Sequence, residues 1–166
     1  MSIVTFVEER VLFSPNIPVE VNNLLQAAVA ASSIDQNQAE NLFLQAHQLD
    51  IHCLQTYFAL YKFYFFQKRL ADAERLVLAA LKESARQSGF PGEYQLLSEN
   101  RQRWNLYANE CSLFYLYSLK ALAFIKLRQG RASEAEHVLA HLRLLDPDDL
   151  SGASVIMDLA AGVEED

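Results

Sequence analysis

The 166-residue sequence is poor in the residues that interrupt helices, since it holds only five glycines and four prolines. Its two cysteines, Cys53 and Cys111, lie far apart and form no CxxC motif, so we expect thiols and neither a disulfide nor a metal site. No apolar run reaches membrane-spanning length, because Lys62, Lys68 and Lys120 interrupt the candidates. These absences favour a compact helical protein with no membrane partner.

The sequence also lacks the motifs of catalysis and of secretion. It contains no GxSxG nucleophile turn and no glycine-rich phosphate loop, so we expect no enzymatic activity and no cofactor. The opening residues, MSIVTFVEER, do not show the basic-then-apolar pattern of a signal peptide. We therefore expect a cytoplasmic protein.

The formal net charge of −7 argues against nucleic acid as a partner, because a phosphate backbone would be repelled. The charge is uneven: residues 1–61 carry −5, residues 62–143 carry +5 and residues 144–166 carry −7. A basic middle could attract an acidic partner or the acidic tail, and it could equally consist of ordinary solvated helix faces.

The most informative stretch is 51–86, which predicts two helices joined by a short turn. The first helix is apolar on nearly every side and must be covered on several sides. The second shows one apolar stripe at i, i+3, i+4 spacing, which is typical of an outer helix. The aromatic and aliphatic residues of the first helix are Tyr57, Phe58, Leu60, Tyr61, Phe63, Tyr64, Phe65 and Phe66.

The rest of the chain divides around this stretch into a single domain. We expect an N-terminal arm (1–17), helical hairpins at 19–50, 51–86 and 105–148, an insertion loop at 87–104 and a capping helix at 150–161. Asp35 is placed to cap the helix that follows it, and Gly130 is placed to end the helix before it.

Three segments align without gaps: AENLFLQAHQLD (39–50), AERLVLAALKES (73–84) and AEHVLAHLRLLD (135–146). The first two are 34 residues apart, and the third follows 62 residues later, with the polar insertion accounting for much of the excess. Such self-similarity indicates a helical repeat whose units stack because none can cover its own apolar face.

On these residues the chain resembles the tetratricopeptide repeat (TPR) family over about 19–148, although Tyr61 stands where the family usually has glycine. The resemblance implies an all-α fold, a right-handed α-α superhelix of about three hairpins with a C-terminal capping helix. The consensus places are occupied by Ala39, Phe43, Ala46, Tyr57, Leu60, Tyr64, Ala73, Ala80, Leu119, Leu122, Ala123, Gly130, Ala135, Leu139, Leu142 and Pro147.

In that family the first helices of the hairpins line a groove that holds a peptide or helix of a partner protein. The resemblance therefore implies a partner-binding groove, aromatic with scattered cations, that suits aliphatic anchors and an acidic flank. The residues that alignment carries into it are Leu24, Gln55, Phe58, Lys62, Phe65, Phe66, Tyr117, Lys120, Phe124 and Arg128. The same aromatics could instead be core, or be covered by the 1–13 arm or the 87–103 insertion.

We therefore expect a non-enzymatic protein–protein interaction module, an adaptor or small chaperone. A self-associating structural homodimer is the alternative from another class. Length, acidity and repeats also look like the chaperones of bacterial type III secretion translocators. The runs TYFALYKFYFF and GFPGEY look like small stand-alone bacterial TPR proteins, some of them associated with nitrogen fixation.

His137 and His141 lie four residues apart on one predicted helix, a spacing that some metal ligands show. No HExxH order and no third ligand accompany them. We therefore expect no metal centre there, and a packed or solvated pair is the simpler interpretation.

Overall fold

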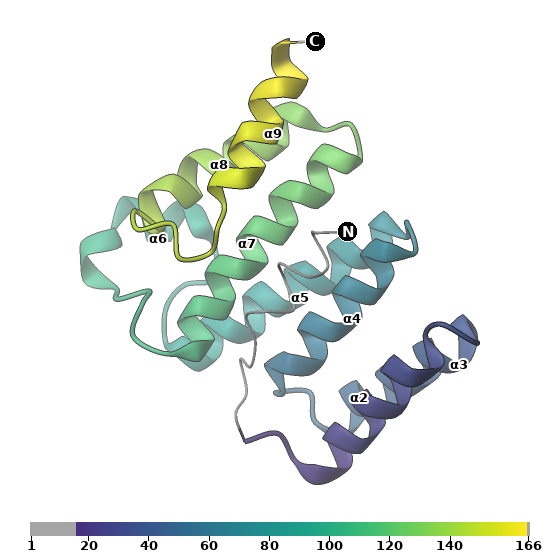
Figure 1. Cartoon of the computed structure of the whole chain (residues 1–166). Helices are drawn as coiled ribbons and strands as arrows, with labels where there is room; N and C mark the ends of the chain where they lie inside the picture. The colour runs from purple at the N-terminus through teal and green to yellow at the C-terminus, as the bar shows by residue number, and fades with distance from the viewer. Residues whose placement is uncertain (1–15, 166) are drawn as a thin grey trace.

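The computed structural model describes residues 16–165, and within them it contains eight α-helices, one 3-10 turn and no strand (Figure 1). The all-α prediction is confirmed. Residues 1–15, most of the expected arm, lie outside the described residues. The helices are α2 (Val19–Ala31), α3 (Gln36–Leu49), α4 (Leu54–Phe66), α5 (Leu70–Ser88), α6 (Tyr94–Glu99), α7 (Glu110–Arg128), α8 (Ala132–Leu145) and α9 (Ser154–Glu165), with the 3-10 turn at Arg101–Arg103.

The helices pack as sequential antiparallel pairs, α2 with α3, α4 with α5, and α7 with α8. Helix α5 also packs along α7 as extensively as along α4, so the second and third pairs are closely joined. The first pair is joined less closely, through α3 and α4. Helix α9 lies against α8 and α7 at the far end from α2 and α3 (Figure 1).

Helix α4 is buried on several sides, as its aromatic sequence predicts. Eight of its thirteen residues are buried: Leu54, Thr56, Tyr57, Phe58, Leu60, Tyr61, Phe63 and Tyr64. Helix α5 buries a narrower stripe that includes Ala73, Val77 and Ala80, each fully buried. The small side chains of this stripe let the α5 backbone approach its neighbours closely, and its opposite side faces solvent.

The helix ends follow local chemistry. The Asp35 carboxylate accepts a hydrogen bond from the Gln38 backbone N–H at 3.1 Å, which confirms it as the N-cap of α3. Gly130 ends α7 with a φ of 76°, in the left-handed region that favours glycine. Lys68 takes the corresponding place after α4, with a φ of 63°. The residue after each left-handed position makes the same backbone hydrogen bond. The Arg69 N–H donates to the Tyr64 carbonyl, and the Arg131 N–H donates to the Lys126 carbonyl.

The insertion at 87–104 is more structured than the predicted loop. Helix α5 runs on to Ser88, and α6 packs against α8. Phe90 is buried and its ring meets the Tyr115 ring edge-on, with centroids 5.1 Å apart. The Tyr115 hydroxyl donates to the Gly92 carbonyl at 2.5 Å. These contacts hold the insertion against α7 and α8, although its sequence is mostly polar.

We expect Lys68→Gly to stabilise the protein by about 1 kcal/mol, because glycine accepts the left-handed backbone that costs lysine energy. The Lys68 side chain is exposed, so its removal disturbs no core contact. Thermal unfolding followed by circular dichroism checks this, with an expected rise of about 2–4 °C.

The matched control is Gly130→Ala, for which we expect a loss of about 1 kcal/mol. A Cβ at Gly130 would meet no atom within 4 Å, so only the backbone conformation is altered. A fall in stability for Lys68→Gly would contradict this explanation of the two turns.

Candidate functional site

An apolar cavity of about 120 Å³ lies between α4, α7 and α9, and we call it the α7–α9 cavity. Helices α4 and α7 supply two aromatic walls, and α9 with the residues before it closes a third side. The lining residues are Phe58, Tyr61, Lys62, Phe65, Phe66, Tyr117, Lys120, Ala121, Phe124, Ile125, Gly152, Val155, Ile156 and Leu159. Phe66, Val155 and Leu159 are respectively 44%, 53% and 45% exposed, so the cavity has an apolar rim that solvent reaches.

Among the described residues that line this cavity, two are lysines and none is acidic. The Lys62 ammonium lies 5.1 Å from the centroid of the Phe58 ring, and the Lys120 ammonium lies 5.0 Å from that of Tyr117. Both are cation–π contacts, which position the charges beside aromatic faces. Lys120 also donates to the Ser151 carbonyl at 2.5 Å. The described lining of the cavity is therefore apolar and includes two cationic side chains, in a chain whose net charge is −7.

The segment between α8 and α9 is fixed in place by a buried carboxylate. Asp146 accepts hydrogen bonds from the Leu150 N–H at 2.9 Å and from the Ser151 N–H and hydroxyl at 2.9 and 2.6 Å. The Tyr107 hydroxyl also donates to Asp146, and burial together with this bond raises the pKa of Tyr107. The Tyr117 hydroxyl donates to the Leu150 carbonyl at 3.2 Å. These bonds set the start of α9 and thereby the third wall of the cavity.

A second cavity of about 600 Å³ lies between α2, α3 and α4, and we call it the α2–α3 cavity. It shares Phe58, Lys62 and Phe66 with the α7–α9 cavity, so the two adjoin along α4. Among the described residues that border it, none is acidic. Ile17, which precedes α2, also lines it. We call the two cavities together the α4 groove.

The structure brings most of the predicted groove residues together. Gln55 lines the α2–α3 cavity, whereas Leu24 and Arg128 line neither cavity of the α4 groove. Leu24 instead packs, half-buried, against the core, and its neighbour Leu25 faces the cavity. Seven others line the α7–α9 cavity: Phe58, Lys62, Phe65, Phe66, Tyr117, Lys120 and Phe124.

Sequence reasoning assigned α9 only the role of a cap, and it missed that α9 supplies a wall of the cavity. The signal was present in the spacing of Val155, Ile156 and Leu159, which places three apolar side chains on one stripe of a helix. What that stripe faces depends on the turn at Asp146, a tertiary feature.

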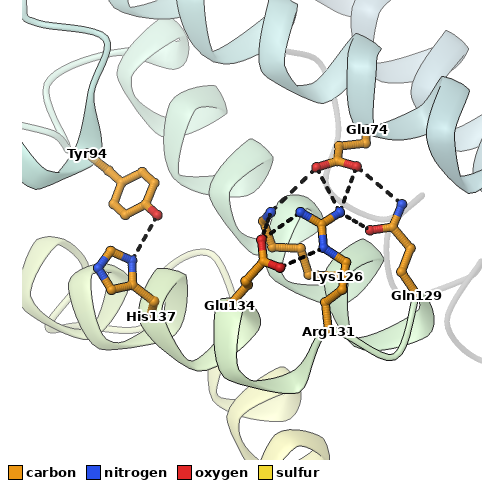
Figure 2. Close-up of polar contacts among 7 residues, drawn as sticks. All are labelled: Glu74, Tyr94, Lys126, Gln129, Arg131, Glu134 and His137. Carbon is orange, nitrogen blue, oxygen red and sulfur yellow. Dashed lines mark hydrogen bonds and ion pairs between the residues drawn. The ribbon is translucent and has the colours of Figure 1, made fainter.

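A polar cluster joins α5 to the turn between α7 and α8 (Figure 2). Arg131 donates to both oxygens of Glu74, at 3.1 and 3.3 Å, and to Glu134 at 2.6 Å. Lys126 and Gln129 complete the cluster around Glu74. Burial alone would raise the pKa of Glu74, but the hydrogen bond from Gln129 and the charges of Lys126 and Arg131 hold it below its usual value.

The same cluster recurs between the first and second pairs. Arg69 donates to both oxygens of Glu40, at 2.8 and 3.1 Å, and to Asp72 at 2.9 Å. The Tyr64 hydroxyl donates to Glu40 at 2.6 Å, in the position that Lys126 takes beside Glu74. The Arg69 hydrogen bonds, followed by that of Tyr64, lower the pKa of Glu40. We call these two arrangements the Arg–Glu clamps.

The two histidines hold α6 on α8. The Tyr94 hydroxyl lies 3.2 Å from His137 Nδ1, as Figure 2 shows, and the Ser98 hydroxyl lies 2.6 Å from His141 Nδ1. Burial and the neighbouring His137 lower the pKa of His141. Within residues 16–165, no three His, Cys, Asp or Glu side chains converge as metal ligands would. The pair packs against α6, and neither residue borders the α4 groove.

We expect Glu74→Gln to destabilise the protein by about 1–2 kcal/mol at pH 7, because its charge-assisted bonds to Arg131 and Lys126 are lost. The pKa of Glu74 is lower in the folded state than in the unfolded chain, so protonation favours unfolding. The clamp's stabilisation is therefore present above about pH 4.5 and is lost as the pH falls below it.

Urea unfolding at pH 7 and at pH 3 measures this difference, with Asp158→Asn on the exposed side of α9 as the control. The wild type should lose more stability between the two pH values than Glu74→Gln does. Equal losses in the two proteins would contradict a stabilising role for this clamp.

None of the helices described over residues 16–165 is both long and apolar enough to cross a membrane. Comparison of the chain with protein-family models, with curated protein sequences and with solved structures finds no match. The resemblance to TPR proteins therefore depends on the residues of this chain and stays a prediction.

Proposed function

We propose that this chain is a non-enzymatic binding module, an adaptor or small chaperone, that holds a segment of a partner protein in the α4 groove. One observation carries the proposal: the α7–α9 cavity is lined by aromatic and aliphatic side chains and two lysines, and by no described acidic residue. Exposed apolar residues at its rim are typical of a surface that a partner covers.

The chemistry of the cavity defines the partner. Aromatic walls suit aliphatic side chains presented at i, i+3, i+4 spacing by an amphipathic helix, or at alternate positions by an extended segment. The ammonium groups of Lys62 and Lys120 favour an acidic residue beside those anchors. We therefore propose an apolar partner segment with an acidic flank.

Two features support a TPR-like architecture for this module. The three aligned segments open on α3, α5 and α8, the second helices of the three pairs, and their equivalent first residues Ala39, Ala73 and Ala135 are all fully buried. In two of the segments the second residue is a glutamate, Glu40 or Glu74. Each glutamate accepts a hydrogen bond from the arginine that precedes the second helix of the next pair, Arg69 or Arg131. Equivalent residues thus make equivalent contacts, as stacked repeats require.

The test uses paired aspartate substitutions at the exposed rim of the α7–α9 cavity. Phe66→Asp with Leu159→Asp should abolish capture of the partner by the full chain, because each places a carboxylate where we propose an apolar anchor. Both side chains are nearly half exposed, so helicity by circular dichroism should persist. Phe58 is a poorer target, because it is 8% exposed and packs on Phe114.

The matched control is Leu78→Asp on α5, since Leu78 is 49% exposed and does not line the groove. Affinity capture with mass spectrometry should identify a partner that the control retains and the rim variant loses. A synthetic peptide of that partner's apolar, acid-flanked segment should compete for the wild type. A partner that both variants retain equally would overturn the proposed groove.

If the protein proves to be a homodimer through this cavity, a self-associating structural role replaces the proposed binding of a partner. Sedimentation of the wild type and of the rim variant at micromolar concentration distinguishes the two. A wild-type dimer that the rim variant converts to a monomer would mean that a second copy fills the cavity. A monomer in both would leave the groove to a different protein.

A further inference from the structure

We propose that the first helical pair, α2 with α3, is a hinged lid on the α4 groove. The pair turns about the junction of α3 with Asp50, and the Arg–Glu clamp at Glu40 latches it. The inference rests on the proposed function of the groove as a binding surface, and it adds how that surface is regulated.

The first reason is the small contact between this pair and the rest of the molecule. Its main contact with the other described helices is that of α3 with α4, which is much less extensive than that of α5 with α7 (Figure 1). The contact includes the rings of Phe43 and Phe63, whose centroids lie 5.1 Å apart. Structure with few tertiary contacts opens at a lower free energy than a closely packed core. The joint between the first and second pairs therefore opens more readily than the joint between the second and third.

The second reason is the place where the chain can bend. Helix α3 ends just before Asp50, which is extended with a φ of −149° and a ψ of 96°. The Tyr57 hydroxyl donates to the carbonyl of the next residue, Ile51, at 2.8 Å. The Gln87 side chain donates to the His52 carbonyl at 2.7 Å. Since α4 and α5 thus hold the linker, the pivot lies where α3 meets Asp50.

The third reason is the position of the clamp at Glu40. Glu40 lies nine residues before the end of α3, which places it about 14 Å from the pivot. Its carboxylate accepts hydrogen bonds from Arg69 at 2.8 and 3.1 Å and from the Tyr64 hydroxyl at 2.6 Å. Arg69 precedes α5 and Tyr64 lies on α4, so the clamp ties this lever to both helices of the second pair. Both members of the ion pair are partly exposed, so water can replace these bonds when the pair turns.

A turn about this pivot changes one cavity of the groove and spares the other. The α2–α3 cavity has Leu25 of α2 and Phe43 of α3 on one side and α4 on the other, so its width follows the position of the pair. The described lining of the α7–α9 cavity comes from α4, α7, α9 and Gly152, and it includes no residue of the pair. The groove thus combines a fixed subsite with an adjustable one.

This division determines how a partner segment enters. The α7–α9 cavity keeps its shape and can receive an apolar anchor in either position of the lid. The α2–α3 cavity admits the rest of the segment when the pair has turned outward. While the open form is the minor one, the rate of association is proportional to its population.

Distances measured by double electron–electron resonance in the full chain test the lid without any partner. Spin labels at Asn37→Cys on α3 and Ala79→Cys on α5 report the position of the pair, and both residues are exposed. Serine replaces the native Cys111 and also Cys53, which is the N-cap of α4, a position where serine is preferred. We expect two populations of distance between the labels. Glu40→Gln should raise the ratio of long to short distances about two- to fivefold, as a partly exposed ion pair allows.

The equivalent clamp supplies the matched control. Labels at Ala79→Cys and at Ala140→Cys on α8 should give one narrow distance in the wild type and in Glu74→Gln, because the packing of α5 on α7 holds that joint. A single α3–α5 distance that Glu40→Gln leaves unchanged would overturn the lid, even if that variant unfolds at a lower temperature. A second population between α5 and α8 would overturn it too, because the opening would not belong to the first pair.

Binding kinetics connect the lid to the proposed function, with the partner identified by affinity capture as the probe. Glu40→Gln should raise the association rate constant of that partner by the same factor as the ratio of distances. Glu74→Gln should leave the rate constant unchanged. An unchanged rate in Glu40→Gln would overturn the regulatory role of the lid.

The two proposals can fail separately. A partner that the rim variant Phe66→Asp with Leu159→Asp loses, together with a single α3–α5 distance, would leave the proposed function standing and overturn the lid. Two α3–α5 populations that respond to Glu40→Gln, together with a partner that the rim variant retains, would support the lid and overturn the proposed groove.

Discussion

Helix α4 carries more apolar side chain than its immediate partners can cover, and the arrangement of the other helices depends on this excess. Its thirteen residues include four phenylalanines and three tyrosines around the whole circumference. Helix α5 covers one side, α3 a second and α7 part of a third. Because none of these helices can surround α4, an apolar strip remains, and α9 meets one edge of it. The α7–α9 cavity lies between this strip and the facing side chains of α7 and α9.

The Arg–Glu clamps determine how neighbouring pairs meet around that helix. In both clamps an arginine that follows a left-handed turn reaches back to a glutamate in the second helix of the preceding pair. Two nitrogens of Arg69 donate to the two oxygens of Glu40, a bidentate contact that constrains angle as well as distance. One nitrogen of Arg131 donates to both oxygens of Glu74. Each clamp thus links the second helix of one pair to the start of the second helix of the next. The clamp at Glu74 joins α5 to the turn between α7 and α8, and α5 packs along both α4 and α7.

Much of this could be predicted from sequence because it follows from local periodicity. The helical pairs, the cap at Asp35 and the turn at Gly130 each depend on a few adjacent residues. The aligned Ala-Glu segments lie on α3, α5 and α8, but nothing in them indicated that Arg69 and Arg131 would contact Glu40 and Glu74. Lys68 shows the limit, because sequence alone gave no sign that a lysine would take the left-handed place of a glycine.

The candidate site was less predictable, since it depends on contacts between distant elements. Alignment with the TPR pattern predicted that Phe65 and Phe124 both line the groove. In the structure the centroids of their rings lie 5.1 Å apart. The position of α9, which forms the third wall of the α7–α9 cavity, depends on the hydrogen bonds of Asp146. Two of its partners, Tyr107 and Ser151, are 44 positions apart in the chain, so the sequence pattern around α9 could not reveal this contact. Leu24 lines neither cavity whereas its neighbour Leu25 does, because consecutive residues of a helix point about 100° apart.

Carbene footprinting of the full chain, alone and with its captured partner, tests the central claim most directly, because it reports which side chains become covered. Binding in the α4 groove predicts that labelling falls at Phe66, Val155 and Leu159 and stays unchanged at Leu78 on the outer side of α5. Protection of Leu78 with continued labelling of Phe66 and Leu159 would contradict it, since the partner would then lie on the opposite surface.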